Sequence, residues 1–578
     1  MKVLFVMRHG GYVRNYESVL RQLAGEGHQI HIAVELDRNK MGEDIVGQNL
    51  AREIPAVTIG RAPVPEEGVW SRAARVNRLL IDFLRYTHPQ YKAATGLRTR
   101  AERTVPRTFR PFLHLVERFG AAGGALVTGV LRDLESVIPL SVEVTDFLRS
   151  QAPDVVLVTP LVDPGSIQVD YIKSSRALGI PVALAVASWD NLTNKGAIRV
   201  VPDKVFVWNQ AQVEEAVTLH GVPRDRVVAT GAQIFDHWFS WKPSRTREQF
   251  CQAMGLDPSL PIILYLGSSS FIAPNEAGFG LRWLSSLRSA ADEVVAGANI
   301  LIRPHPSNAT QWAGLDLEQW PRTALWPPAG ADFFAPEFKH DFFDSLYFST
   351  AVVGVNTSAQ IEAAILGRIV CTVTSSDFTH SQGGTLHFHH LVNGGLVEIA
   401  RDLNEHAAHL GVMLRGGGEQ AERSRRFVEY FVRPFGIDQP ATPRLAAAIV
   451  DLGARPAPKD NPDTAVVRLA RQILYPLAWF VADMPDRRPW WVYVLMRPPV
   501  FLFVQAWALP YRLRNAALAV PRLLLALQRE VQKSTRRFVL DSCKEGIKHI
   551  RNRSRWVVHR VRVNTRVIGA RVLRGRTK

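Results

Sequence analysis

Cysteine is scarce in this sequence: 578 residues hold three, at Cys251, Cys371 and Cys543. Their odd number and wide spacing exclude a disulfide scaffold and a Cys-x-x-Cys metal site. Long apolar runs near the start are scarce too: Val3–Met7 is followed at once by Arg8, so we expect no secretion signal there. We therefore expect the chain in a reducing, cytosol-facing compartment.

Acidic residues are scarce only at the C-terminal end. Residues 451–578 hold 26 Lys and Arg against 8 Asp and Glu, a net charge of +18 in a chain whose total is +17. The first 450 residues therefore carry a net charge of −1. With 47% apolar and 21% charged residues the chain is globular in composition, and its length predicts several domains. This partition predicts a near-neutral enzyme with a basic appendage.

Short, continuously apolar runs recur along the first 450 residues and alternate with helical patterns. Runs of this kind are typical of parallel strands buried on both faces. We predict an α/β fold with two Rossmann-like domains and a helical basic C-terminal appendage. The predicted strands are Val3–Val6, Ile30–Val34, Asp154–Val158, Pro181–Val186, Lys204–Trp208, Pro261–Leu266, Asn299–Ile302, Ala351–Val355 and Arg368–Val373.

The change of pattern along the chain predicts three regions. The first α/β domain spans residues 1–237 and carries a helical insertion at about 70–150. The second spans 238–450, and the basic tail spans 451–578. The insertion is either a solvated helical subdomain or a surface that faces an acceptor or a membrane.

The sharpest local pattern is a strand that runs into Asn356, Thr357 and Ser358 before a helix that Gly367 closes. We predict that Thr357 caps this helix and that free amides at its start favour a phosphate. Glu362 lies one turn further on and could accept hydrogen bonds from ribose hydroxyls. The alternative is an ordinary capped helix with a surface glutamate.

Three other loops follow predicted strands of the second domain, where ligands bind in doubly wound sheets. Gly267–Ser270 offers close backbone approach, and Arg303–Pro306 offers a cation, although Arg303 could equally serve in a structural ion pair. The loop Asp377–His390 is rich in histidine but lacks carboxylate or cysteine at ligand spacing, so we expect no metal there. The candidate donor-binding residues from these loops are Ser268, Ser269, Arg303, His305, His380, Gln382 and Thr385.

Thr357-Ser358 with Glu362-Ala363 resembles the donor-binding half of GT-B glycosyltransferases, a superfamily that also holds UDP-N-acetylglucosamine 2-epimerases and CDP-glycerol glycerophosphotransferases. The stretches 205–236 and Ser188–Gly196 are similar to the interdomain region and to a loop of bacterial surface-polysaccharide members. The resemblance covers about residues 1–450. It implies two domains facing a cleft, a nucleotide-activated donor on the second domain with Glu362 on the ribose, and neither metal nor further cofactor. It implies diphosphate contacts from Thr357, Ser358, Ser268, Ser269 and Arg303.

An inverting transfer needs a base for the proton of the acceptor hydroxyl. His9, after the first strand, is similar to the histidine base of some family members, and Asp163 and Asp190 compete with it. A backbone-satisfied loop histidine and an Asx-turn at Asp190 are the plain alternatives, and a retaining enzyme would need none of these bases. The expected acceptor-side residues are Gly10, Gly11 and Asn191.

The basic tail combines tryptophan-rich apolar stretches with a final run of arginines. Its longest charge-free run in the apolar part, Pro498–Tyr511, has 14 residues and is too short to span a bilayer. We expect residues 475–578 to lie on an anionic membrane surface. Packing of the apolar part on the α/β domains and nucleic-acid binding by the arginines are the alternatives.

Together these features predict a bacterial peripheral glycosyltransferase on the inner face of the plasma membrane, in cell-envelope polysaccharide synthesis. Its expected partners are a nucleotide sugar and a lipid-linked or surface-glycan acceptor. The alternatives are a CDP-polyol phosphotransferase using Arg303 and His305, a 2-epimerase-like enzyme, and a basic nucleic-acid-binding protein without enzymatic activity.

Overall fold

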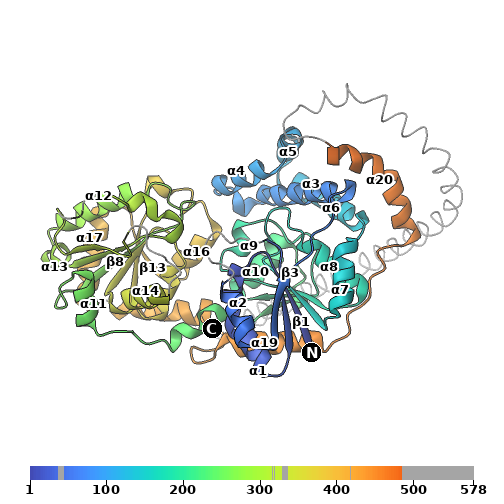
Figure 1. Ribbon diagram of the computed structural model, residues 1–578. Coiled ribbons are helices and arrows are strands. Elements are labelled where there is room, and N and C mark those ends of the chain that lie inside the picture. Colours follow the sequence, from blue (N-terminus) through green and yellow to red (C-terminus); the bar gives the residue numbers. More distant parts are fainter. Residues whose placement is uncertain (37–44, 316, 318, 329–335, 417, 484–578) are drawn as a thin grey trace, which may run out of the picture. The chain divides into compact units, whose positions relative to one another are not determined.

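The computed structural model describes residues 1–483, apart from 37–44, 316, 318, 329–335 and 417 (Figure 1). Residues 1–462 belong to one compact unit that contains two β-sheets. The expected membrane-facing stretch 475–578 lies outside the described residues from position 484 onward.

Sheet A, the first of the two, has seven parallel strands in the order β3-β2-β1-β4-β5-β6-β7. Val3 of β1 is opposite Ile30 of β2 on one side and Val155 of β4 on the other. The strands are β1 (Lys2–Met7), β2 (Gln29–Val34), β3 (Val57–Arg61), β4 (Val155–Thr159), β5 (Val182–Ala185), β6 (Lys204–Val207) and β7 (Val227–Ala229).

Sheet B has six parallel strands in the order β10-β9-β8-β11-β12-β13, which repeats the order of the first six strands of sheet A. In each sheet the order reverses at one place, between β1 and β4 and between β8 and β11. The strands are β8 (Ile262–Leu266), β9 (Asn299–Arg303), β10 (Thr323–Leu325), β11 (Ala351–Gly354), β12 (Ile369–Val373) and β13 (Val397–Ala400). Two parallel α/β domains are therefore confirmed.

All nine strands predicted from the sequence are interior strands of these sheets. The four that were not predicted, β3, β7, β10 and β13, are the edge strands. Every residue of β4 and β8 is buried, whereas β7 and β10 are half-buried throughout. An edge strand is covered less completely and so needs no continuous apolar run.

Helices flank both sheets (Figure 1). The helices of the first domain are α1 (Glu17–Gly25), α2 (Ile45–Glu53), α3 (Val69–Leu84), α4 (Thr95–Thr104), α5 (Arg110–Glu117), α6 (Gly120–Val137), α7 (Val142–Gln151), α8 (Gln168–Leu178), α9 (Asn191–Asn194) and α10 (Gln210–His220). Those that follow are α11 (Arg247–Met254), α12 (Glu276–Arg288), α13 (Glu293–Gly297), α14 (Pro336–Phe348), α15 (Ala359–Ile365), α16 (Leu386–Asn393), α17 (Leu403–Gly416), α18 (Gly418–Phe427), α19 (Ala441–Gly453) and α20 (Ala465–Asp483).

The helical insertion lies between β3 and β4 and has a small core of its own, to which Leu80, Leu97 and Leu113 contribute. A buried ion-pair group fastens it to the domain, because Arg78 of α3 contacts both Glu135 of α6 and Asp170 of α8 at 2.7 Å. Removing one member would leave an uncompensated buried charge, which is strongly destabilising.

The helix α19 returns to the first domain. Leu445, Ile449 and Leu452 join the core that covers one face of sheet A, and the Thr442 hydroxyl lies 2.8 Å from that of Ser18 on α1. The last helix that begins within residues 238–450, the stretch predicted as the second domain, thus packs against the first sheet.

Among the described helices, α20 alone is long and apolar enough, by length and composition, to cross a membrane. Its apolar residues do not form a long charge-free run in the sequence, because Arg468 and Arg471 interrupt them. Ile473 and Leu477, one turn apart, are both more than half exposed.

Candidate functional site

The loop after β8 lies tightly against the end of β9. Gly267 donates its N–H to the carbonyl of Arg303, and a Cβ at Gly267 would lie 2.7 Å from the backbone nitrogen of His305. Only glycine allows this approach. The N–H of Ser268 donates to Glu276 Oε2 at 2.7 Å, and the carbonyl of Ser269 accepts two turn hydrogen bonds. The predicted phosphate contact at Ser268 therefore cannot use its backbone amide.

Glu276 of α12 escaped the sequence analysis. It is fully buried, and burial raises its pKa to about 8, although hydrogen bonds from Ser268 and Tyr265 oppose the shift. The Tyr265 hydroxyl donates to Oε1 at 3.3 Å. Glu276 thus holds the β8 loop in place, and its signal in the sequence, one carboxylate in an apolar helix, is not distinctive.

Arg303 and His305 both follow β9 but have different surroundings. The Arg303 guanidinium is buried and donates to the Ser345 hydroxyl at 2.9 Å and to the carbonyl of Asp341 at 3.2 Å. Both partners are uncharged, so these contacts are not the ion pair named as the alternative for Arg303. His305 Nδ1 accepts from the N–H of Ser307 at 3.1 Å, which leaves its proton on Nε2.

The turn after β11 differs in detail from the prediction. The N-cap of α15 is Ser358, not Thr357, and its side chain makes no capping bond. Thr357 Oγ1 accepts weakly from the N–H of Ala359 at 3.4 Å, and Gln360 Oε1 takes the N–H of Thr357 at 3.1 Å. Gly367 closes the helix at a φ of +67°, as predicted. Most amides at the start of α15 are thus already bonded within the protein.

Glu362 lies in the first turn of α15 and is partly exposed. Burial raises its pKa to about 7, and the positive charge of Arg14 opposes the shift. Arg14 is exposed and comes from the short helix η1 (Gly10–Asn15) after β1. The pKa of His305 is lowered mainly by burial and further by the positive charge of Arg14. The charge of Arg14, from the first domain, therefore lowers the pKa of both Glu362 and His305 of the second. Arg14 was missed, since a lone arginine after a glycine turn carries no pattern.

In the loop after β12, the polar groups of Gln382 and Thr385 form hydrogen bonds within the protein. Gln382 Nε2 donates to the carbonyl of Val373 at 2.9 Å, and Gln382 Oε1 accepts from the N–H of Ser375. The Thr385 hydroxyl donates to carbonyls of its own loop. These two residues shape the loop. His380 lies at its tip, where Nδ1 is 3.3 Å from the Thr95 hydroxyl of α4.

His387 of α16 joins several predicted residues. Its Nδ1 is 3.0 Å from Asn194 Oδ1, and its Nε2 is 3.1 Å from Asn356 Nδ2. Both contacts are satisfied when Nδ1 carries the proton. Burial lowers the pKa of His387 to about 4, so it is neutral. This chain connects the loop after β5 with the turn after β11.

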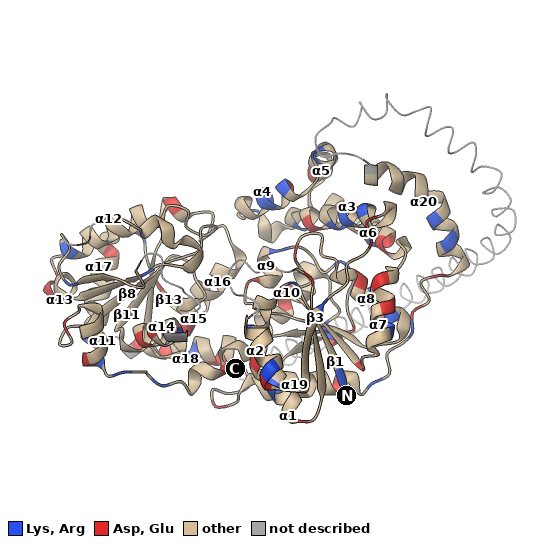
Figure 2. Cartoon of the chain, viewed as in Figure 1, with Lys and Arg blue, Asp and Glu red and all other residues tan. Residues whose placement is uncertain are grey.

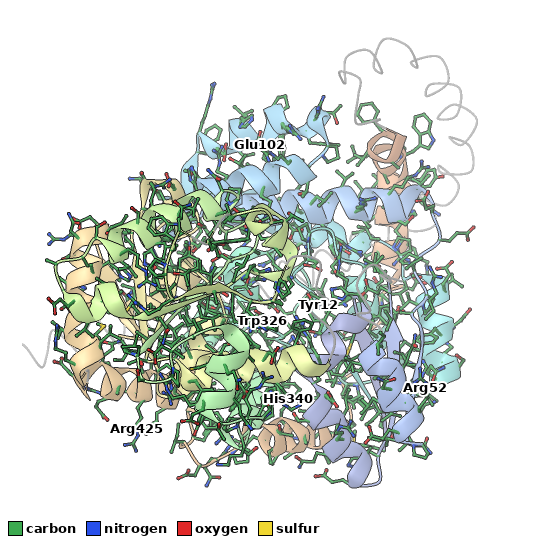
Figure 3. All side chains as sticks on the ribbon, turned by 60° about the vertical axis from the view of Figure 1, so that its left-hand side comes forward. Tyr12, Arg52, Glu102, Trp326, His340 and Arg425 are labelled. Atoms are coloured by element: carbon green, nitrogen blue, oxygen red, sulfur yellow. The ribbon has the colours of Figure 1, made fainter. Side chains whose placement is uncertain are left out.

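The carboxyl end of sheet A is charged but paired. Asp163, after β4, lies 2.9 Å from Arg8 Nε and 3.0 Å from Lys195 Nζ. Burial would raise the pKa of Asp163, and the charges of Lys195 and Arg8 outweigh it, so the pKa lies below its usual value. Lys195 Nζ also lies 3.3 Å from the hydroxyl of Tyr12, which Figure 3 labels. A carboxylate held this way is a weak base.

His9 directly precedes η1, and the centre of its ring lies 4.6 Å from the centre of the Tyr12 ring. Of the next two residues, Gly10 is buried and Gly11 is half-buried. Asp190 accepts from the Ser188 hydroxyl at 2.6 Å. Its pKa is also lowered, because the electrostatic interaction with His387, the charge of Lys195 and hydrogen bonds outweigh burial. Asn191 Oδ1 accepts from a backbone N–H of the same loop.

One further carboxylate follows a strand of sheet A. Glu35, directly after β2, is buried, and burial raises its pKa to about 7. Within the described part of the chain, no group of three or more His, Cys, Asp or Glu side chains lies close enough to hold a metal ion.

No protein-family model and no curated protein matches the sequence. Among solved structures, the chain is similar to the UDP-GlcNAc 2-epimerase from Neisseria meningitidis bound to UDP-GlcNAc, at 13% identity and a TM-score of 0.46, over 78% of this chain and 99% of that one. It is similar to a glycosyltransferase from Rickettsia africae at 9% identity and a TM-score of 0.45, over 78% and 99%. It is also similar to the calicheamicin glycosyltransferase CalG4 at 12% identity and a TM-score of 0.41, over 78% and 98%.

Proposed function

We propose that this protein is a GT-B type glycosyltransferase that moves a sugar from a nucleotide-activated donor to a lipid-linked or surface-glycan acceptor. The observation that carries the proposal is that His305 and Glu362 follow β9 and β11, the two strands on either side of β8, at the carboxyl edge of sheet B. The positive charge of Arg14 acts on the pKa of both residues. This edge lies where the strand order reverses, the usual ligand position in such sheets.

The donor fits these groups by its chemistry. Ionised Glu362 accepts hydrogen bonds from two ribose hydroxyls. Arg14 supplies positive charge for the diphosphate, and His305 has Nε2–H to donate to a phosphate oxygen. Charge that develops on the leaving diphosphate is then met by side chains, so the proposal includes no metal and no further cofactor.

The acceptor hydroxyl must lose its proton during an inverting transfer. Asp163 and Asp190 both have lowered pKa values, which makes them poor proton acceptors. His9, at the end of β1, is the base that we propose. Gly10 and Gly11, which have no side chains, follow it directly in the chain.

We further propose that the enzyme acts as a peripheral protein at the cytoplasmic face of the membrane. The basic tail and the exposed apolar side chains of α20 support this location, since both attract an anionic lipid layer. A 2-epimerase-like reaction would need no membrane. A polyol-phosphate transferase was expected to use Arg303, whose Nη1 is bonded to the Ser345 hydroxyl and the Asp341 carbonyl inside the protein.

A binding panel of UDP-, GDP- and CDP-linked sugars tests the donor proposal. We expect one nucleotide class to raise the melting temperature of the full chain. Glu362→Gln should weaken that nucleotide sugar about 10- to 100-fold, the worth of hydrogen bonds to a charged group. Glu293→Gln is the matched control, because Glu293 is an exposed first-turn glutamate of α13 in the same domain.

Two results would contradict the proposal. Binding of no nucleotide sugar would remove the donor, and equal affinity of Glu362→Gln and the natural protein would remove Glu362 from the site. Release of free epimerised sugar nucleotide without any acceptor would favour the epimerase alternative instead.

A further inference from the structure

Several large apolar side chains of the helical insertion are exposed, on α5 and α6 and at their junction. Figure 1 shows where α5 and α6 lie. Phe112, Leu115 and Phe119 are 43%, 52% and 68% exposed and follow a helical spacing of three and four. Leu126 and Val130, four apart on α6, are 73% and 53% exposed. We call these five residues the α5–α6 surface.

This exposure does not come from loose packing. Leu113 and Val116 of α5 and Leu131 of α6 are buried in the core of the insertion. Gly124 lies so close to η2 (Arg85–Thr87) that a Cβ there would overlap the Thr87 side chain. The helices are therefore seated by one face, and the α5–α6 surface is the opposite one.

The charge around this surface is positive. Residues 92–118 contain seven Lys and Arg and only two acids, Glu102 and Glu117. Glu117 is paired, because Arg98 Nε donates to it at 2.6 Å. Glu102, which Figure 3 labels, lies 3.2 Å from His114 Nε2, a contact that is an ion pair only when the histidine is protonated. The basic residues of this segment outnumber its acids.

The remaining arginines are available. Arg103, Arg107 and Arg118 are exposed, and none of them forms an ion pair with another described residue. Figure 2 colours the Lys and Arg of α4 and α5 blue. A surface with apolar side chains and unpaired cations is complementary to anionic lipid, which offers acyl chains beneath phosphates.

The same insertion touches the loops of sheet B. The Arg100 guanidinium of α4 lies 4.5 Å from the ring centre of Phe271, in the loop after β8, and Thr95 contacts His380 in the loop after β12. Arg98 joins α4 to α5 through Glu117. One helix therefore connects the α5–α6 surface with the strand-end loops.

We propose that the α5–α6 surface docks on an anionic lipid layer, with its apolar side chains at the boundary of headgroups and acyl chains and with Arg103, Arg107 and Arg118 on lipid phosphates. This goes beyond the proposed function, because the contact is separate from both the nucleotide site and the basic tail. Its effect is to place a membrane-borne acceptor beside the loops that α4 touches.

The test uses the full chain with phosphatidylcholine vesicles that either contain or lack phosphatidylglycerol. Hydrogen–deuterium exchange should slow in peptides covering residues 110–130 only with the anionic vesicles, and less so at high salt. Phe112→Ser with Phe119→Ser should weaken vesicle partition about tenfold or more. The control, Val412→Ser on α17, removes a side chain that is 71% exposed and should change nothing.

Two outcomes would overturn the proposal. Vesicle binding with unchanged exchange across residues 110–130 would assign the membrane contact elsewhere in the chain. A change in the sedimentation of the double variant without vesicles would make the α5–α6 surface a contact between copies of the protein. Nucleotide-sugar affinity, measured on the same double variant, should stay unchanged, which separates this inference from the proposed function.

Discussion

The carboxyl ends of the two sheets differ in chemistry although their strand orders agree. At sheet A, Asp163 is paired with Arg8 and Lys195, so the charges there are balanced inside the protein. At sheet B, Glu276 is buried with a pKa of about 8, and Glu362 is partly exposed with a pKa of about 7. Strand order thus determines where the carboxyl ends of the strands meet, whereas the residues at those ends decide which groups are free to bind a ligand.

The largest effect is expected at the paired edge. Asp163→Asn leaves Arg8 and Lys195 without their carboxylate, and we expect the free energy of unfolding to fall by about 3 kcal/mol. Chemical denaturation measures it, with Asp146→Asn as the control, since the pair of Asp146 with Arg149 is exposed and contributes little. Unchanged stability with lost turnover would instead make Asp163 catalytic.

The two edges should also respond oppositely to pH. The carboxyl of Glu276 keeps its proton up to about pH 8 in the folded chain but loses it near 4.5 when unfolded. Its contribution to stability is therefore complete below pH 4.5 and is lost as the pH rises to 8. The contribution of Asp163 is instead lost at acid pH, as the pH falls through its lowered pKa.

Denaturation curves of Glu276→Gln and the natural protein, measured from pH 5 to pH 8, test this difference. Glutamine keeps an acceptor for the N–H of Ser268 and does not titrate. We expect the variant to gain stability relative to the natural protein as the pH rises. Parallel curves would show that Glu276 ionises as an ordinary carboxyl group.

The smallest effect is expected at the carboxyl ends of sheet B, where Glu362 is partly exposed. As the pH falls below about 7, Glu362 takes up a proton and loses acceptor capacity for the ribose. Nucleotide affinity should then drop up to about tenfold for one pH unit, because one proton is bound per site. Titration calorimetry at pH 6 and 8 measures it, and a pH dependence that persists in Glu362→Gln would assign it to another group.

The strands that the sequence predicted are those buried on both faces. Two examples are the fully buried strands Val155–Thr159 and Ile262–Leu266. Their apolar runs are easily recognised in the sequence. The edge strands Val227–Ala229 and Thr323–Leu325 are half-buried, so their residues need not differ from those of a loop. The strand order itself has no local signature.

The candidate site was predicted in part. The strand-end positions of His305 and Glu362 followed from the α/β pattern, but the use of each polar group did not. Gln382 bonds to the end of the strand before its own loop, whereas Arg303 bonds to Ser345 in another helix. Neither partner could be chosen from the residue type alone. Arg14 and Glu276 carried no pattern at all. His387 was noticed only as one of a histidine cluster.

The α/β class, the interior strands and the separation of a neutral body from a basic tail follow from the amino-acid sequence alone, because they depend on composition and on periodicity along the chain. The three-dimensional packing is needed to know which strand ends meet, which carboxyl groups keep their proton in the interior and which arginines stay exposed. Those properties depend on burial and on the charges of neighbours that lie a hundred or more residues away, as the contact of Asn194 with His387 illustrates.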